Sequence, residues 1–146
     1  MTYREAINLG EKVLNMADVA DAKIDAWLLL EMVCKIDRSF YYLHMEDEVA
    51  EEQLSEYEIA LRKRAEHVPL QYIVGEAEFM GLKFKVNSNV LIPRQDTETL
   101  VEEALKVVKP GMKVLDLCTG SGCIGILRND GEAHSSHDRV DRYNLL

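Results

Sequence analysis

The first 70 residues place apolar side chains at intervals of three and four, which is the period of an amphipathic helix. Thr2 and Glu5 have the S/T-x-x-E spacing of a capping box, so the first helix is expected to begin at once and to continue through Met16. Further helices are predicted over about residues 22–35, after a cap at Asp37, and over about residues 48–66. Four short amphipathic helices with brief loops predict a small bundle.

The core of this bundle is expected to consist of the apolar stripes of its helices. The stripes are Tyr3, Ile7 and Leu14; Ile24, Trp27, Leu28, Leu30 and Val33; Phe40, Tyr41 and Leu43; and Ala50, Leu54, Tyr57, Leu61 and Ala65. Trp27 and the other aromatic residues are assigned to the core, because aromatic side chains at helical spacing are far more often core than ligand cage.

The period of the pattern changes after Pro69, which ends the helical region. Between Glu76 and Val86, apolar residues tend to alternate with charged ones, and Gly81 lies midway. This pattern predicts a short β-hairpin that turns near Met80 and Gly81. A hairpin of this length is not stable alone, so it must pack on another element.

A helix, a strand and a glycine loop are predicted next. Asp96 or Thr97 is expected to cap a helix that runs to Lys109. Val114, Leu115 and Leu117 then form a short apolar run typical of a buried strand. The strand leads through Cys118 and Thr119 into Gly120-Ser121-Gly122, where glycines permit a sharp turn and free N–H groups can bind a carboxylate or phosphate. This order is the start of a doubly wound α/β sheet, in which ligands bind beyond the carboxyl ends of the strands. For an isolated G-x-G, an ordinary turn is the commoner explanation.

The predicted organisation has four parts. Residues 1–70 form a helical domain, 71–92 a hairpin connector, 93–126 the first elements of an α/β domain, and 127–146 a tail with little periodicity that we expect to be disordered. The fold class is therefore α + α/β. Leu115, Leu117, Ile124 and Ile126 lack strands that would cover them, which favours self-association through the exposed sheet.

Composition excludes several functions. The net charge is −9 and the pI about 4.9, which argues against a nucleic-acid partner because phosphate binding needs a basic face. Three cysteines without a disulfide framework fit a reducing cytoplasm, and no apolar run approaches the length of a membrane span. His134 and His137 form an H-x-x-H pair, but without further ligands arranged around it we expect no metal site.

Three motifs in order resemble those of the release factor glutamine N5-methyltransferases, the HemK/PrmC family. They are Pro69-Leu70-Gln71-Tyr72-Ile73 with Gly75, then Leu91-Ile92-Pro93-Arg94-Gln95-Asp96-Thr97-Glu98, then Asp116-Leu117-Cys118-Thr119-Gly120-Ser121-Gly122-Cys123-Ile124. The resemblance covers about residues 1–126. It implies a helical domain that helps bind a class I peptide chain release factor, followed by the start of an incomplete Rossmann-type methyltransferase domain.

The same resemblance implies that S-adenosylmethionine is the methyl donor and that the acceptor is the glutamine amide of a Gly-Gly-Gln motif. Asp116, Cys118, Thr119, Gly120, Ser121 and Gly122 match the donor-binding loop and the acid before it, and Arg94 and Glu98 lie in a motif that borders the same pocket. The alternatives are a turn cap for Asp116 and a surface ion pair for Arg94.

The chain departs from the family pattern in one respect that concerns catalysis. The family's acceptor motif, Asn-Pro-Pro-Tyr, is absent, since the three prolines are Pro69, Pro93 and Pro110 and no two are adjacent. The resemblance therefore implies no catalytic residue in this chain, which we expect to be inactive alone, and the tail after Ile126 suggests an aberrant end or a changed reading frame. Two alternatives are a non-enzymatic module that binds release factors and, less favoured, a nucleotide-binding Rossmann fragment.

Overall fold

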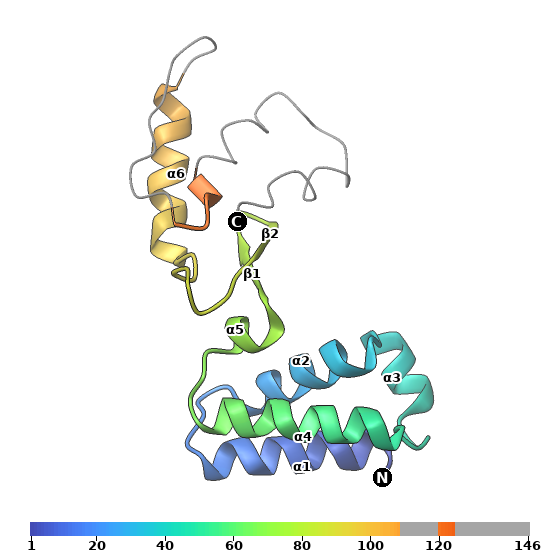
Figure 1. Ribbon diagram of the computed structural model, residues 1–146. Coiled ribbons are helices and arrows are strands. Elements are labelled where there is room, and N and C mark those ends of the chain that lie inside the picture. The colour runs from blue at the N-terminus through green and yellow to red at the C-terminus, as the bar shows by residue number, and fades with distance from the viewer. Residues whose placement is uncertain (109–119, 125–146) are drawn as a thin grey trace. The chain divides into compact units, whose positions relative to one another are not determined.

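The computed structural model describes residues 1–108 and 120–124, and the chain divides into two compact units, Met1–Val74 and Gly75–Leu146. The first unit holds α1 (Tyr3–Met16), α2 (Ala22–Cys34), α3 (Arg38–His44), α4 (Glu51–Ala65) and α5 (Leu70–Val74). The second holds β1 (Glu76–Phe79), β2 (Leu82–Lys85) and α6 (Gln95–Val107). Figure 1 labels these elements along the chain.

The predicted capping box begins α1. The Glu5 N–H donates to Thr2 Oγ1 at 3.2 Å, and the Thr2 N–H donates to Glu5 Oε2 at 2.9 Å. These two bonds satisfy N–H groups that a helix start would otherwise leave free. The helix then buries Tyr3, Ala6, Gly10 and Leu14, which are three and four residues apart, so its predicted start, end and period are confirmed.

The second and third helices form where predicted, but their buried faces differ in part from the prediction. Asp37 caps α3 by accepting from the Phe40 N–H at 2.7 Å, as expected. Ile24 was assigned to the core and is 55% exposed, and Leu43 is 82% exposed. In α2 apolar residues occupy several faces, so the period alone could not decide which face the bundle covers.

The start of the fourth helix lies later than predicted, because the residues before it pair with the beginning of the chain. Thr2 and Glu48 form an antiparallel bridge, and the Val49 N–H donates to the Met1 carbonyl at 3.0 Å. This extended pairing holds residues 48 and 49 outside the helix, which begins at Glu51 instead of about Glu48. Figure 1 shows α1 and α4 side by side, with α2 packed against both.

A short helix that the pattern did not predict, α5, follows Pro69. The Pro69 carbonyl accepts from the N–H groups of Tyr72 and Ile73 at 3.0 and 3.3 Å. Proline therefore ends one helical region and opens the next turn, where its missing N–H costs nothing. Leu70, Ile73 and Val74 pack against the core of the bundle, so α5 completes the first unit.

One ion pair lies at the edge of the bundle core. Arg64 Nε donates to Asp25 Oδ2 at 2.6 Å, and another nitrogen of its guanidinium donates to the Val68 carbonyl at 3.2 Å. Asp25 is the only charged residue that is fully buried among those described. The pair ties α2 to the end of α4, and Arg64 compensates a carboxylate that burial alone would strongly destabilise.

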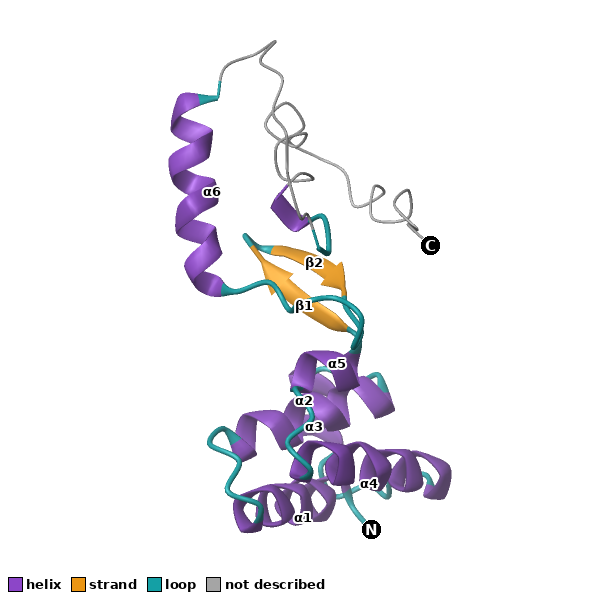
Figure 2. Ribbon diagram, turned by 60° about the vertical axis from the view of Figure 1, so that its left-hand side comes forward, coloured by secondary structure: helices purple, strands orange, loops and turns teal. Residues whose placement is uncertain are grey.

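The second unit begins with the predicted hairpin. Its strands pair in antiparallel register from Glu76↔Lys85 to Phe79↔Leu82, so Met80 and Gly81 form a two-residue turn, which confirms the predicted position. Both turn residues have positive φ, 52° at Met80 and 75° at Gly81, as a type I′ turn requires. Figure 2 shows this pair of strands in orange.

The predicted cap of α6 is wrong. Its N-cap is Arg94 rather than Asp96 or Thr97, and the helix ends at Val107 instead of Lys109. Asp96 lies in the first turn, where the partial positive charge of the helix N-terminus stabilises a carboxylate. Val101 on this helix is 3% exposed and packs in one cluster with Phe79, Phe84 and Cys123, which supplies the packing partner that the hairpin needs.

None of the helices in the described part of the chain is long and apolar enough to cross a bilayer. Within residues 1–108 and 120–124, no group of three or more His, Cys, Asp or Glu side chains is placed to hold a metal ion. His134 and His137 lie outside the described residues.

Candidate functional site

The glycine loop is the first part of the candidate site. Gly120 has a φ of 57° and Gly122 a φ of 77°, a region that residues with a side chain rarely adopt. Among the described residues other than its chain neighbours, none has an atom within 4 Å of the place that a Cβ on Gly120 would take. The loop therefore turns as its sequence predicts, and the described residues leave space beside its first glycine.

Cys123 anchors this loop to the rest of the second unit. Its side chain is 6% exposed and packs with Phe79, Phe84 and Val101, and Ile124 is partly buried against the same cluster. Ile124 was expected to be uncovered, whereas this cluster of the hairpin, α6 and Cys123 covers it in part. Leu115, Leu117 and Ile126 lie outside the described residues.

Arg94 lies at the N-cap of α6 with extended backbone. Its guanidinium donates to Asp96 Oδ2 at 2.7 Å in an exposed ion pair, which is the surface role considered for it as an alternative. An exposed ion pair of this kind contributes little free energy and its carboxylate can be replaced by another, so the guanidinium remains available to a ligand carboxylate.

Glu98 lies in the first turn of α6 and is partly buried. Its Oε1 accepts a hydrogen bond from the Met80 backbone N–H at 2.7 Å. The side chain thus contacts the turn of the hairpin. Nothing in the sequence motif indicated this partner, which is 18 residues away along the chain.

Arg94 therefore forms an ion pair with Asp96, and Glu98 accepts a hydrogen bond from Met80. Cys123, the residue after the glycine loop, packs against the aromatic residues of the hairpin. Among the described residues the structure does not join Arg94 or Glu98 to Gly120, Ser121 or Gly122. Asp116, Cys118 and Thr119 lie outside the described residues. We did not predict from the sequence that Cys123 anchors the loop. The signal was present, because Cys123 and Ile124 are consecutive apolar residues directly after the loop, and such residues are usually buried.

The described residues of this loop fit a ligand with an anionic group. Two glycines at positive φ, with an exposed first glycine that no described residue beyond its chain neighbours approaches, allow a ligand to come close to the backbone. Backbone N–H groups at the start of a helical turn bind carboxylates well. The amino-acid portion of S-adenosylmethionine carries such a carboxylate, so the loop fits that donor as far as it is described.

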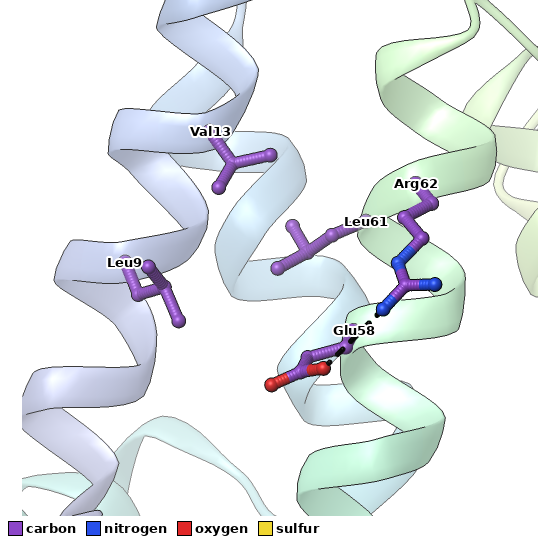
Figure 3. A pocket seen from close by; sticks show the side chains of 5 residues that line it. All are labelled: Leu9, Val13, Glu58, Leu61 and Arg62. Atoms are coloured by element: carbon purple, nitrogen blue, oxygen red, sulfur yellow. Dashed lines mark ion pairs between the residues drawn. The ribbon is translucent and has the colours of Figure 1, made fainter.

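A groove between α1 and α4 is the second candidate site, and it lies in the first unit. It has a volume of about 200 Å³ and is lined by Leu9, Val13, Glu58, Leu61 and Arg62. Figure 3 shows the three apolar side chains facing one another across the groove, with the Glu58–Arg62 ion pair at its rim. An apolar floor with charged rim residues can accept an apolar side chain of another protein.

Buried groups of the first unit are arranged for structure rather than for chemistry. Burial raises the pKa of Tyr57 far above its ordinary value, and the nearby Cys34 raises it further. Burial, with a smaller effect of Glu56, likewise raises the pKa of the Cys34 thiol. A thiol with a raised pKa carries little thiolate at neutral pH, so Cys34 is a poor nucleophile.

Comparison with known proteins defines the class of this helical unit. The family of PrmC N-terminal domains matches residues 5–75, which reach from the first turn of α1 to the residue after α5. The matched segment therefore coincides with the five-helix unit that the structure separates from the hairpin.

Curated relatives extend the match beyond that domain. The release factor glutamine methyltransferase of Clostridium botulinum is 40% identical over 128 residues, and that of Clostridium acetobutylicum is 44% identical over 128 residues. The protein of the same name from Geobacter sulfurreducens is 38% identical over 125 residues. Each of these alignments covers 86% of this chain. Residues 5–75 therefore belong to the family of PrmC N-terminal domains, and the chain is similar over most of its length to release factor glutamine methyltransferases. It spans 45% of the length of the first two relatives and 44% of the third.

Proposed function

We propose that this chain is the N-terminal part of an S-adenosylmethionine-dependent methyltransferase that modifies the glutamine of the Gly-Gly-Gln motif in a class I release factor. The observation that carries the proposal is the sequence identity of 38–44% with methyltransferases of that name over 86% of the chain. In this proposal the helical unit recognises the release factor. The hairpin, α6 and the glycine loop begin a Rossmann-type methyltransferase domain.

The donor site is assigned to the residues that match the family motifs. Gly120, Ser121 and Gly122 offer backbone N–H groups to the donor carboxylate, and Cys118 and Thr119 lead into this loop. Asp116 is assigned to the methionine portion, Arg94 to the border of the pocket, and Glu98 to the same border. Bound there, S-adenosylmethionine would supply a methyl group activated by its sulfonium.

The acceptor site is not assigned to any residue of this chain. An amide nitrogen is a weak nucleophile, so the transfer depends on holding that nitrogen in line with the methyl group. The Asn-Pro-Pro-Tyr motif that would hold the amide does not occur in these 146 residues. We therefore expect the 146-residue polypeptide to bind the donor weakly and to transfer no methyl group.

A transfer assay tests this proposal. A purified class I release factor and S-adenosylmethionine labelled in its methyl group are incubated with the 146-residue chain or with the Clostridium botulinum relative. Label should enter the release factor only with the relative, and only when the glutamine of Gly-Gly-Gln is present. Transfer by the 146-residue chain well above background would contradict the assignment of the acceptor site to residues that it lacks.

The structure of the first unit favours a second candidate function, that of a binding module without catalysis. Met1–Val74 has its own core around Leu14, Leu29, Leu30 and Tyr57, so this unit has the packing that a domain needs to fold independently. Calorimetric titration of this unit with the release factor separates the two candidates. Binding without transfer supports the module, and absence of binding at high micromolar concentration removes it.

A further inference from the structure

The hairpin turn has a backbone donor that the hairpin itself does not use. Phe79 and Leu82 form the last pair of the ladder, so Met80 and Gly81 lie beyond it. The Met80 N–H therefore has no partner in the opposite strand. Met80 is also a non-glycine residue with a φ of 52°, a conformation that persists only where surrounding contacts hold it.

Glu98 provides the missing acceptor. Its Oε1 lies 2.7 Å from the Met80 nitrogen, and the bond is partly buried. A partly buried N–H without an acceptor is destabilising, and a carboxylate is a stronger acceptor than a carbonyl. The residue type at position 98 thus suits the backbone group that it contacts.

Packing of α6 brings the carboxylate to this place. Val101 lies three residues after Glu98, so both side chains are on one face of the helix. Val101 packs in the cluster of Phe79 and Phe84, the two aromatic residues of the hairpin. The same helix face therefore contacts the hairpin through an apolar residue and through a hydrogen bond to its turn.

We propose that Glu98 is a positioning residue, which fixes the hairpin turn to α6 and thereby restrains the segment between them. That segment, residues 86–94, leaves β2 at one end and reaches the N-cap of α6 at the other. It carries Arg94, so Glu98 acts on the border of the donor pocket through the backbone. The effect of Glu98 on the donor pocket rests on the proposed function, whereas the restraint of the segment does not.

Amide exchange measured by NMR on the 146-residue chain tests the restraint. Glu98→Ala removes the acceptor, Glu98→Gln keeps an oxygen at the same place without the charge, and Glu102→Ala is an exposed control on the same helix. The Met80 amide should exchange about tenfold faster in Glu98→Ala, because a hydrogen bond to a charged group is lost. It should stay within about threefold of the parent in Glu98→Gln, where a neutral bond remains.

Two further sets of amides make the result decisive. Asn89 and Val90, whose N–H groups donate to Asn87 at 2.9 and 3.1 Å, should also exchange faster in Glu98→Ala. The Val86 amide, which donates to Gly75 at 2.9 Å, reports whether the hairpin is still formed. The proposal would be overturned if the exchange rate of the Met80 amide were unchanged in Glu98→Ala. It would also be overturned if that rate rose equally in Glu98→Ala and Glu98→Gln. The measurement contains no cofactor, so its outcome is independent of whether the chain takes part in methyl transfer.

Discussion

Alanine in place of Gly10 on α1 should destabilise the first unit. A Cβ on Gly10 would overlap Tyr57 Oη, and it would lie 3.0 Å from Tyr57 Cζ and 3.2 Å from Ala26 Cβ. The Tyr57 ring cannot move aside freely, because its side chain is 1% exposed and its hydroxyl donates to the Ala26 carbonyl at 3.1 Å. Gly10 therefore permits α1, α2 and α4 to approach one another closely.

The magnitude follows from two opposing effects. Alanine in a helix interior is about 1 kcal/mol more favourable than glycine. Overpacking a well-filled core costs about 1–3 kcal/mol, and losing the Tyr57 hydrogen bond adds about 1 kcal/mol. We expect Gly10→Ala to lower the free energy of unfolding by about 1–3 kcal/mol.

Urea denaturation of the chain, followed by the fluorescence of its single tryptophan, measures this change. Trp27 is buried in the first unit, so it reports on that unit. Tyr57→Phe removes the oxygen nearest to the new methyl group, and Gly10→Ala in that background should cost about 1 kcal/mol less than in the parent. Asn8→Ala, at an exposed position of α1, is the control for helix propensity. An unchanged or higher stability of Gly10→Ala would refute the reasoning.

Three further predictions concern the first unit. Asp25→Ala should lower the free energy of unfolding by about 3 kcal/mol, because it leaves the partly buried Arg64 guanidinium without its carboxylate. Glu58→Ala, which breaks an exposed ion pair, should lower it by less than about 1 kcal/mol. Equal effects of the two variants in urea denaturation would contradict this prediction. Thr2→Ala should lower the thermal midpoint by removing a cap worth about 1 kcal/mol, and a midpoint equal to that of the parent would show that the cap contributes nothing. Burial raises the pKa values of Cys34 and Tyr57 in the folded state, so the unfolded chain releases these protons first, at ordinary values of 9.0 and 10.0. The stability that these two groups contribute should therefore be fully present below pH 9.0 and be lost as the pH rises above it. Cys34→Ala and Tyr57→Phe should each make the alkaline loss of stability less steep, and a pH profile that neither variant changes would argue against these two groups.

Local signals in the sequence predicted much of the helical unit. The capping box at Thr2 and Glu5 and the cap at Asp37 act within one turn, so the start of α1 and that of α3 could be read directly. The later start of α4 could not, because it depends on Thr2 pairing with Glu48 from a distant part of the chain. The exposure of Ile24 likewise depends on which face of α2 the other helices cover.

The candidate site was predictable to a smaller extent. Alternation and Gly81 indicated the hairpin turn, and the glycines at 120 and 122 indicated positive φ, since both features follow from backbone sterics. The partner of Glu98 was not predictable, because a backbone N–H leaves no signature in the residue type at position 80. The N-cap of α6 was misplaced because Asp96 and Thr97 are good capping residues, yet Arg94 takes the extended conformation directly after Pro93.

Mass spectrometry of the release factor tests the central claim most directly. The factor is incubated with S-adenosylmethionine and the 146-residue chain, then digested, and the peptide that contains Gly-Gly-Gln is weighed beside one treated with the Clostridium botulinum relative. We predict a mass increase of one methyl group on that peptide with the relative and none with the 146-residue chain. A methylated glutamine produced by the 146-residue chain alone would contradict the account.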